Sequence, residues 1–217
     1  WSSDVCSSDL YRRLGATDRY QEVNDKVKIN LGSGHWKLDD WVNVDIDRES
    51  QPDVCANLAA GLPFANGVAS LMHTEDFIDQ LELEQAGEFM RECHRILCPG
   101  GVLRVLTPDM RQLAQLYLNE PEKLQTMWKS FVGVPLSLDT AGEIFNISMR
   151  FAGHTFLYDE ETFTALASRC GFDAHRVDYQ QSDMPELRGL DLRSPENALS
   201  LYFDCYRLPL AKPHISV

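Results

Sequence analysis

The most constraining stretch of the sequence is INLGSGHWKLDDWVNVDID, residues 29–47. Two apolar β-forming residues run into Gly32-Ser33-Gly34, and the chain returns as a second apolar strand that ends at Asp45. Glycine lets the backbone approach a ligand closely because it has no Cβ, and a carboxylate can accept two hydrogen bonds from a ribose diol. Ligands of doubly wound sheets bind at the carboxyl ends of parallel strands. The stretch therefore predicts a nucleoside site at two strand ends.

Short apolar segments alternate with amphipathic helices along the rest of the sequence. The clearest helix covers residues 82–97, where apolar residues recur at steps of three and four. Pro108-Asp109 opens a second helix, and Asp159 is expected to cap a third that Gly171 ends. This alternation predicts the α/β class, with a Rossmann-like, doubly wound, mostly parallel sheet. A long polar segment joins the last two expected strands, so we expect them to pair antiparallel. The seven expected strands cover residues 27–31, 41–45, 52–58, 68–73, 101–107, 174–180 and 199–208.

Three segments stand apart from this alternation. Residues 35–40 leave room for about one helical turn, although a parallel crossover usually takes ten residues or more. Residues 121–157 mix proline, glycine and aromatic residues, and we expect an irregular lid over the substrate there. Residues 1–10, WSSDVCSSDL, resemble a translated sequencing adapter, and we expect a non-native leader. The remainder, 11–217, is expected to form a single domain.

Composition excludes several classes of protein. The net charge of −13 argues against a tight binder of nucleic acid, which needs a basic face. No apolar run reaches the roughly 20 residues of a membrane helix, and no secretory signal is recognisable, so we expect a cytoplasmic protein without membrane insertion. Cys93, His94 and Cys98 are too few for zinc, and we expect no metal site. The sequence does not indicate an oligomeric state.

The loop after the first strand discriminates among nucleoside ligands. The GxxxxGK[ST] pattern of a phosphate-binding loop is absent. Lys37 stands where a dinucleotide-binding loop would have its third glycine, and Asp45 follows Gly34 by 11 residues instead of about 20. The loop therefore suits a nucleoside without phosphates, such as S-adenosyl-L-methionine. The two tryptophans that follow it, Trp36 and Trp41, could stack on a ligand or face the sulfonium, but we expect them to pack in the core.

Further blocks follow in a specific order between about Val27 and Leu208. After KINLGSG and VNVDID come DVCANLAAGLPFANGVASLMHTEDFIDQL, FMRECHRILCPGGVLRVLTPDMRQL and GHTFLYDEETFTALASRCGF. Together they resemble the class I S-adenosylmethionine-dependent methyltransferases, in particular a small bacterial, type 11-like branch. The resemblance implies S-adenosyl-L-methionine as cofactor. It also implies methyl transfer to an O or N acceptor on a small molecule or a glycan precursor.

The resemblance also implies roles for particular positions along the strand ends. Gly32, Ser33 and Gly34 would lie beneath the methionine and ribose, and Asp45 would bind the ribose hydroxyls, with Asp47 as the fallback. Asn57 and Leu58 would lie near the adenine. His73, Thr74 and Glu75 would lie beside the methionine and the methyl group.

An oxygen or nitrogen acceptor can need a base to take its proton. The candidate catalytic residues are Glu75, Asp79 and His154, with Asp76 as a further acid after the fourth strand. Each has a plainer interpretation. Asp76 and Asp79 are also what the first turn of a helix favours, and His154 also suits a packing or surface position.

Two departures from the family pattern leave other functions open. Asn57 stands where relatives usually have aspartate, and Asp79-Gln80-Leu81 stands where relatives often have Glu-His-Leu. With these departures, the alternative of an inactive, S-adenosylmethionine-binding scaffold or sensor remains. The glycine loop by itself is also compatible with an NAD-dependent oxidoreductase.

Overall fold

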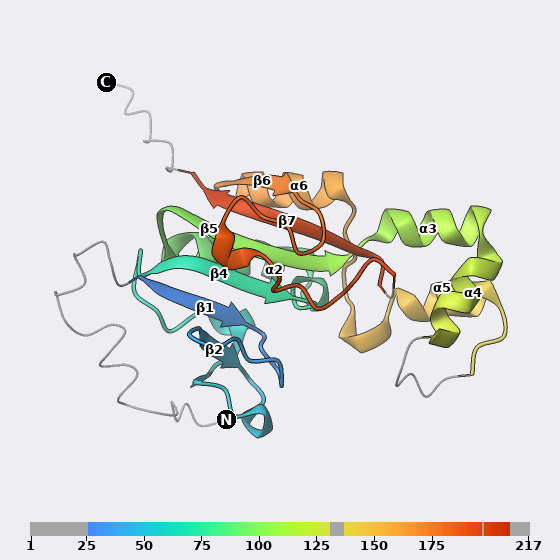
Figure 1. Cartoon of the computed structure of the whole chain (residues 1–217), viewed down its shortest axis with the longest axis horizontal. Helices are drawn as coiled ribbons and strands as arrows, with labels where there is room; N and C mark the ends of the chain where they lie inside the picture. The colour runs from blue at the N-terminus through green and yellow to red at the C-terminus, as the bar shows by residue number, and fades with distance from the viewer. Residues whose placement is uncertain (1–25, 131–136, 197, 209–217) are drawn as a thin grey trace.

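The computed structural model describes residues 26–130, 137–196 and 198–208. Its centre is one seven-stranded sheet of order β3-β2-β1-β4-β5-β7-β6 (Figure 1). β7 runs antiparallel to both β5 and β6, and the other neighbours are parallel. This confirms the predicted doubly wound sheet. The strands are β1 (Val27–Leu31), β2 (Val42–Asp45), β3 (Val54–Cys55), β4 (Ala69–Glu75), β5 (Leu97–Pro108), β6 (Phe172–Arg176) and β7 (Ser200–Arg207).

Helices lie on one face of the sheet and at one end of it (Figure 1). α2 (Leu83–Ile96) and α6 (Glu160–Arg169) pack their apolar side chains on the sheet and form the main core. Asp159 caps α6 as predicted, because its Oδ1 accepts the Thr162 amide at 2.9 Å. Within the described residues, no helix is both long and apolar enough to cross a bilayer.

The prediction that residues 121–157 are irregular is wrong. The segment contains α4 (Pro121–Ser130) and α5 (Ala141–Ser148), which pack with α3 (Met110–Asn119) at the end of the sheet (Figure 1). The helices are short, so each carries little periodic signal, and mutual packing supplies most of their stability. The second core that they build contains Leu113, Leu116, Leu124, Ile144 and Leu157. Residues 1–25 and 131–136 lie outside the described residues, so the expected leader is untested.

Two other strand predictions need correction. β6 spans Phe172–Arg176, earlier than the predicted 174–180, and β3 keeps only two residues of the predicted 52–58. β6 pairs with β7 in antiparallel register from Phe172 to Arg176, so the partner strand sets its bounds. Short edge strands present few backbone groups for unwanted pairing.

The connection between β1 and β2 contains no helix, which explains how it can be short. Polar side chains of the sheet hold it instead. Asn43 accepts the Leu38 amide at 2.9 Å and donates to the Leu38 carbonyl at 3.1 Å, and Asn30 donates to the Trp36 carbonyl at 3.1 Å. Trp41 is buried as expected, whereas Trp36 is 70% exposed, so its predicted place in the core is wrong.

A row of buried polar side chains crosses the sheet on the face opposite α2. We call the set Asn43, Asn30, His73, Arg104 and Asp204 the polar row. Each member is paired in register with the next across β2, β1, β4, β5 and β7. Directly paired residues of neighbouring strands point to the same face, and every member is at most 4% exposed. Buried polar groups need partners, so the segments covering this face are held to it by hydrogen bonds.

Arg104 anchors the segment between β6 and β7 to the polar row. Its Nε donates to Asp191 Oδ1 at 3.0 Å and its Nη2 to Asp191 Oδ2, while Nη1 donates to Asp204 Oδ1 at 3.0 Å. Ser182 Oγ donates to Asp204 Oδ2 at 2.6 Å, which adds a second attachment. The segment therefore crosses the sheet in a defined position and carries its next residues to the end of β4.

Removing this cation tests its importance. We expect Arg104→Met to lower the free energy of unfolding by about 3–5 kcal/mol, because two buried carboxylates lose their partner. Urea denaturation of both proteins measures the difference. The control is Arg176→Met, which breaks an ion pair with Glu160 in which both side chains are about half exposed, and which is expected to cost less than about 1 kcal/mol. Equal losses in the two variants would contradict the assignment.

Candidate functional site

The glycine loop and the acid after β2 are in direct contact. Asp45 Oδ2 accepts the Gly34 amide at 2.7 Å, and Asp45 Oδ1 accepts the Asp47 amide at 2.8 Å. Gly32 and Gly34 both have positive φ, at +69° and +46°, which glycine adopts without strain. A carboxylate has about four acceptor positions, so Asp45 can still accept two hydroxyls. The residues predicted for the ribose thus meet at the ends of β1 and β2.

The end of β4 joins the same place. A Cβ built on Gly32 would lie 3.4 Å from the Cβ of Phe77, so the glycine loop packs closely on the residues after β4. Ser33 and Thr74 are buried, and neither Ser33 Oγ nor Thr74 Oγ1 has a hydrogen-bond partner within the part of the chain that the structure describes. Buried hydroxyls are normally paired. Two unpaired ones at adjacent strand ends fit the polar groups of a ligand.

The positions predicted near the adenine differ in accessibility. Asn57 is exposed, and its Oδ1 accepts the Ala59 amide at 3.0 Å at the start of η2 (Leu58–Ala60). Leu58 is 4% exposed and packs in the main core, so only its backbone can meet a ligand. Ile46, which the sequence analysis missed, is 63% exposed directly after Asp45. An exposed apolar side chain directly after Asp45 can pack on the flat face of an aromatic ligand.

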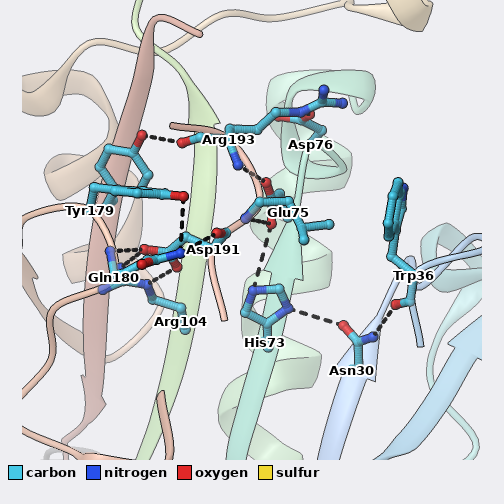
Figure 2. Close-up of polar contacts among 12 residues, drawn as sticks. Asn30, Trp36, His73, Glu75, Asp76, Arg104, Tyr179, Gln180, Asp191 and Arg193 are labelled. Atoms are coloured by element: carbon cyan, nitrogen blue, oxygen red, sulfur yellow. Dashed lines mark hydrogen bonds and ion pairs between the residues drawn. The ribbon is translucent and has the colours of Figure 1, made fainter. Parts of the chain in front are cut away.

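His73 is held in one protonation state by the polar row (Figure 2). Asn30 uses its amide nitrogen for Trp36 and Asn43, so its Oδ1 accepts a hydrogen bond from His73 Nδ1 at 3.0 Å. Burial, helped by the charge of Arg104, lowers the pKa of His73 to about 3. The neutral ring therefore keeps its lone pair on Nε2, which lies 4.0 Å from Glu75 Oε2.

Glu75 joins the end of β4 to the segment that Arg104 anchors. Its Oε1 accepts the Arg193 amide at 2.9 Å and its Oε2 accepts the Leu192 amide at 3.2 Å (Figure 2). Burial, together with the charge of Asp76, raises the pKa of Glu75 to about 7, although the two amides oppose the shift. Glu75 is thus partly protonated near neutral pH, and both of its oxygens are engaged.

Asp76 and Arg193 form an ion pair just beyond Glu75. Arg193 Nε donates to Asp76 Oδ2 at 2.6 Å (Figure 2). Asp76 has φ +52°, a left-handed conformation that residues other than glycine adopt rarely. Arg193 is not among the predicted site residues, because its segment has no periodic pattern and lies far from β4 along the chain.

Asp79 and His154 meet although they are distant in the sequence. Asp79 Oδ2 lies 3.4 Å from His154 Nε2, and Asp79 Oδ1 accepts Thr107 Oγ1 at 3.2 Å. Asp79 lies in the first turn of η3 (Ile78–Gln80), as predicted, yet its side chain is fully buried. Burial and the charge of Asp76 raise the pKa of Asp79 above its ordinary value, and His154 opposes this shift.

The position of His154 is fixed by backbone contacts on both sides. Its Nδ1 donates to the Ser148 carbonyl at 3.0 Å, which leaves Nε2 directed at Asp79. The amides of Thr155 and Phe156 donate to the Asp79 carbonyl at 2.7 and 3.1 Å. The pair thus comes from two separate parts of the chain, η3 and the residues after η4 (Phe151–Gly153).

Comparison with known proteins finds relatives in structure and not in sequence. No protein-family model matches the chain, and no curated protein matches it. A SAM-dependent methyltransferase from Methanosarcina mazei is 14% identical with TM-score 0.50, over 85% of this chain and 93% of that one. The YcgJ protein of Bacillus subtilis is 10% identical with TM-score 0.50, over 92% and 97%. The CMeT domain of the citrinin polyketide synthase is 11% identical with TM-score 0.50, over 87% and 48%.

This chain has the methyltransferase fold. At such low identities the likeness concerns the fold alone, so the chemistry has to be argued from the residues themselves. In this methyltransferase fold, Gly34, Asp45 and Thr74 lie together at the C-terminal ends of β1, β2 and β4.

A cavity of about 150 Å³ opens beside these strand ends of the methyltransferase fold. Asp76, Arg193 and His154 line it on the side of the strand ends. The rest of its wall is mainly apolar and comes largely from the segment predicted as a lid. That wall includes Leu113, Leu124, Met127, Trp128, Phe151 and Leu157.

The raised pKa of Glu75 predicts a pH-dependent stability. The value of about 7 in the folded protein, against 4.5 for an ordinary glutamate, means that ionisation of Glu75 costs stability. The cost is absent below pH 4.5, grows between pH 4.5 and 7, and is complete above pH 7. We expect the free energy of unfolding of the wild type, minus that of Glu75→Gln, to fall by up to about 3 kcal/mol across this window.

Urea denaturation at a series of pH values measures this difference. The control is Glu84→Gln, which removes an exposed carboxylate from α2. For each variant, the free energy of unfolding is subtracted from that of the wild type at every pH. If this difference changes with pH by the same amount for both variants, Glu75 is not the source of the pH dependence.

Proposed function

We propose that this protein is an S-adenosyl-L-methionine-dependent methyltransferase acting on an O or N atom of a small-molecule acceptor. The observation that carries the proposal is the 2.7 Å hydrogen bond between Asp45 and the Gly34 amide, where β1 and β2 end in a methyltransferase fold. That contact holds the acid proposed to bind the ribose directly beside a loop in which two of three residues are glycine.

The cofactor fits the groups at this edge. Asp45 would accept the ribose hydroxyls, Ile46 would cover one face of the adenine, and the Ser33 and Thr74 hydroxyls would meet polar groups of the methionine part. Asn57 and the Leu58 backbone would lie toward the adenine, with Gly32 and His73 bordering the methionine part.

A dinucleotide fits this edge less well. Its pyrophosphate would bind at a helix N-terminus, and no helix follows Gly34 before β2 begins. This argues against the alternative of an NAD-dependent oxidoreductase.

Methyl transfer depends mainly on the alignment of the acceptor atom with the methyl group. S-adenosyl-L-methionine, when bound, supplies an electrophilic methyl group on a sulfonium. Positioning of the two reactants contributes roughly 7–11 kcal/mol to such reactions. We assign the proton of the acceptor to the Asp79–His154 pair as a unit, because His154 Nε2 faces Asp79 Oδ2 at 3.4 Å. Glu75 positions the segment at Leu192 and Arg193 because both of its oxygens hold backbone amides.

Several features support a small-molecule acceptor. The cavity beside His154 is mainly apolar, which favours an apolar molecule over a glycan precursor. The net charge of −13 disfavours a nucleic acid. The described cysteines, at positions 55, 93, 98, 170 and 205, are all free thiols, which supports a cytoplasmic setting.

The first test is calorimetric titration of the full chain with S-adenosyl-L-methionine, S-adenosylhomocysteine and NAD. We expect micromolar binding of the first two and none of NAD. Absence of S-adenosyl-L-methionine binding by a folded protein would overturn the proposal. Binding without turnover across a broad panel of acceptors would favour the inactive scaffold instead.

Substitution of the ribose acid tests the cofactor site. We expect Asp45→Ala to weaken S-adenosyl-L-methionine binding at least tenfold, since hydrogen bonds to a charged group contribute about 1.5–3 kcal/mol. The same calorimetric titration measures it. Asp47→Ala is the matched control, because Asp47 is exposed and accepts the Glu49 amide at 2.9 Å. A change of less than twofold for Asp45→Ala would refute the ribose assignment.

Substitution of the histidine tests the base. We expect His154→Gln to lower kcat by roughly 10²- to 10⁴-fold, as removal of a general base does, while cofactor affinity stays the same. Asp79→Asn is expected to have a smaller effect in the same direction. Initial rates with the best acceptor from the panel measure both. His175→Gln, at an exposed position of β6, is the control, and a comparable loss there would remove His154 from the mechanism.

A further inference from the structure

We propose, on the basis of the methyltransferase function above, that Thr107 is a positioning residue for the Asp79–His154 pair. Its hydroxyl donates to Asp79 Oδ1 and keeps Asp79 in the carboxylate form. The proton that the pair takes up therefore rests on His154 Nε2 and not on Asp79. Thr107 itself acts only through Asp79.

The contacts of His154 determine what its Nε2 atom can carry. A carbonyl oxygen only accepts hydrogen bonds, so His154 Nδ1, which lies 3.0 Å from the Ser148 carbonyl oxygen, carries a proton. His154 Nε2 then bears either a lone pair or a second proton. It faces Asp79 Oδ2 at 3.4 Å, where a lone pair would be repelled by a carboxylate oxygen. The contact therefore favours a pair that holds one proton between Nε2 and Oδ2.

That proton has two possible positions. On His154 Nε2 it gives an imidazolium beside a carboxylate, and on Asp79 Oδ2 it gives a neutral imidazole beside a carboxylic acid. Asp79 is fully buried, and burial favours the neutral acid, which is the main reason why the pKa of Asp79 is raised. A hydrogen bond donated to the carboxylate opposes burial and moves the proton toward His154.

Thr107 supplies this hydrogen bond from a fixed position. Its Oγ1 donates at 3.2 Å to Asp79 Oδ1, the oxygen that does not face His154. Thr107 is fully buried in β5 and is paired in register with Leu201 of β7, so the sheet holds its backbone. A hydrogen bond to a charged acceptor is roughly twice as strong as one to a neutral acceptor. The Thr107 hydroxyl therefore stabilises the carboxylate more than the acid.

The other titratable groups that interact with Asp79 do not replace this hydrogen bond. The charge of Asp76, at the start of the turn after β4, raises the pKa of Asp79 and so favours the acid. Burial and the charge of Asp79 raise the pKa of Tyr158, so its phenol stays neutral. Among the side chains that shift the pKa of Asp79, His154 and Thr107 favour the carboxylate.

The test locates the proton by NMR of the full chain labelled with ¹⁵N in its histidine rings. The Nε2 shift distinguishes a nitrogen that carries a proton from one with a lone pair, and His154→Gln identifies the signal by its loss. We expect Thr107→Val, which keeps the shape and removes the hydroxyl, to lower the ratio of doubly protonated to neutral His154 rings at least about threefold near neutral pH. Thr107→Ser, which keeps the hydroxyl, should retain the wild-type ratio.

Two controls separate this effect from a general change in the protein. His175 lies at an exposed position of β6, and its signal in the same spectra should not move. Thr126→Val removes a hydroxyl from an exposed position of α4 and should leave the His154 signal unchanged. Thr107→Ala takes the place of Thr107→Val if the latter does not fold, with the same expected fall.

An unchanged ratio in the folded variant without the hydroxyl, or an equal fall in Thr107→Ser, would overturn the proposal. The spectra require neither cofactor nor turnover. Absence of S-adenosyl-L-methionine binding by the wild type therefore refutes the methyltransferase function, whereas an unchanged ratio in a protein that binds the cofactor refutes only the role of Thr107.

Discussion

The buried guanidinium of Arg104 is the interaction on which the candidate site depends. A cation without access to water has to be paired, and Arg104 is paired with Asp204 from β7 and Asp191 from the segment before it. The pairing fixes where that segment crosses the sheet. The segment in turn carries Leu192 and Arg193 to the end of β4, where Glu75 and Asp76 receive them. Such a buried network contributes a defined geometry more surely than it contributes stability.

The polar row extends this principle to the other half of the sheet. Asn30 and Asn43 hold the β1–β2 connection by hydrogen bonds, and they do so in place of a crossover helix. Asn30 also sets the tautomer of His73. The face of the sheet away from α2 is therefore covered by two irregular segments. Both segments are hydrogen-bonded to side chains of the polar row, whose members are paired in register between neighbouring strands.

The two halves of the candidate site have different origins. The half proposed to bind the cofactor consists of strand ends, whose positions follow from the sheet. The half proposed to bind the acceptor consists of short helices packed on one another, together with a histidine held by its neighbours. The Asp79–His154 pair joins the halves, since Asp79 follows β4 and His154 lies on the cavity wall. This contact joins an acid and a histidine that lie far apart in the sequence, so the local sequence around Asp79 does not reveal it.

The local sequence was sufficient for the alternation of strands and helices, for the main helices and for the placing of Gly34 and Asp45 at two strand ends. Each of these follows from short-range patterns: alternating apolar strands, helical periodicity, capping aspartates and glycine at a strand end. Only the tertiary structure decided three contacts: Asp79 with His154, Arg193 with Asp76, and Arg104 with two buried acids. They join residues far apart along the chain through single side-chain contacts, which leave no periodic signal. The helices between residues 121 and 148 belong with them, because helices this short are stabilised by the surface on which they pack.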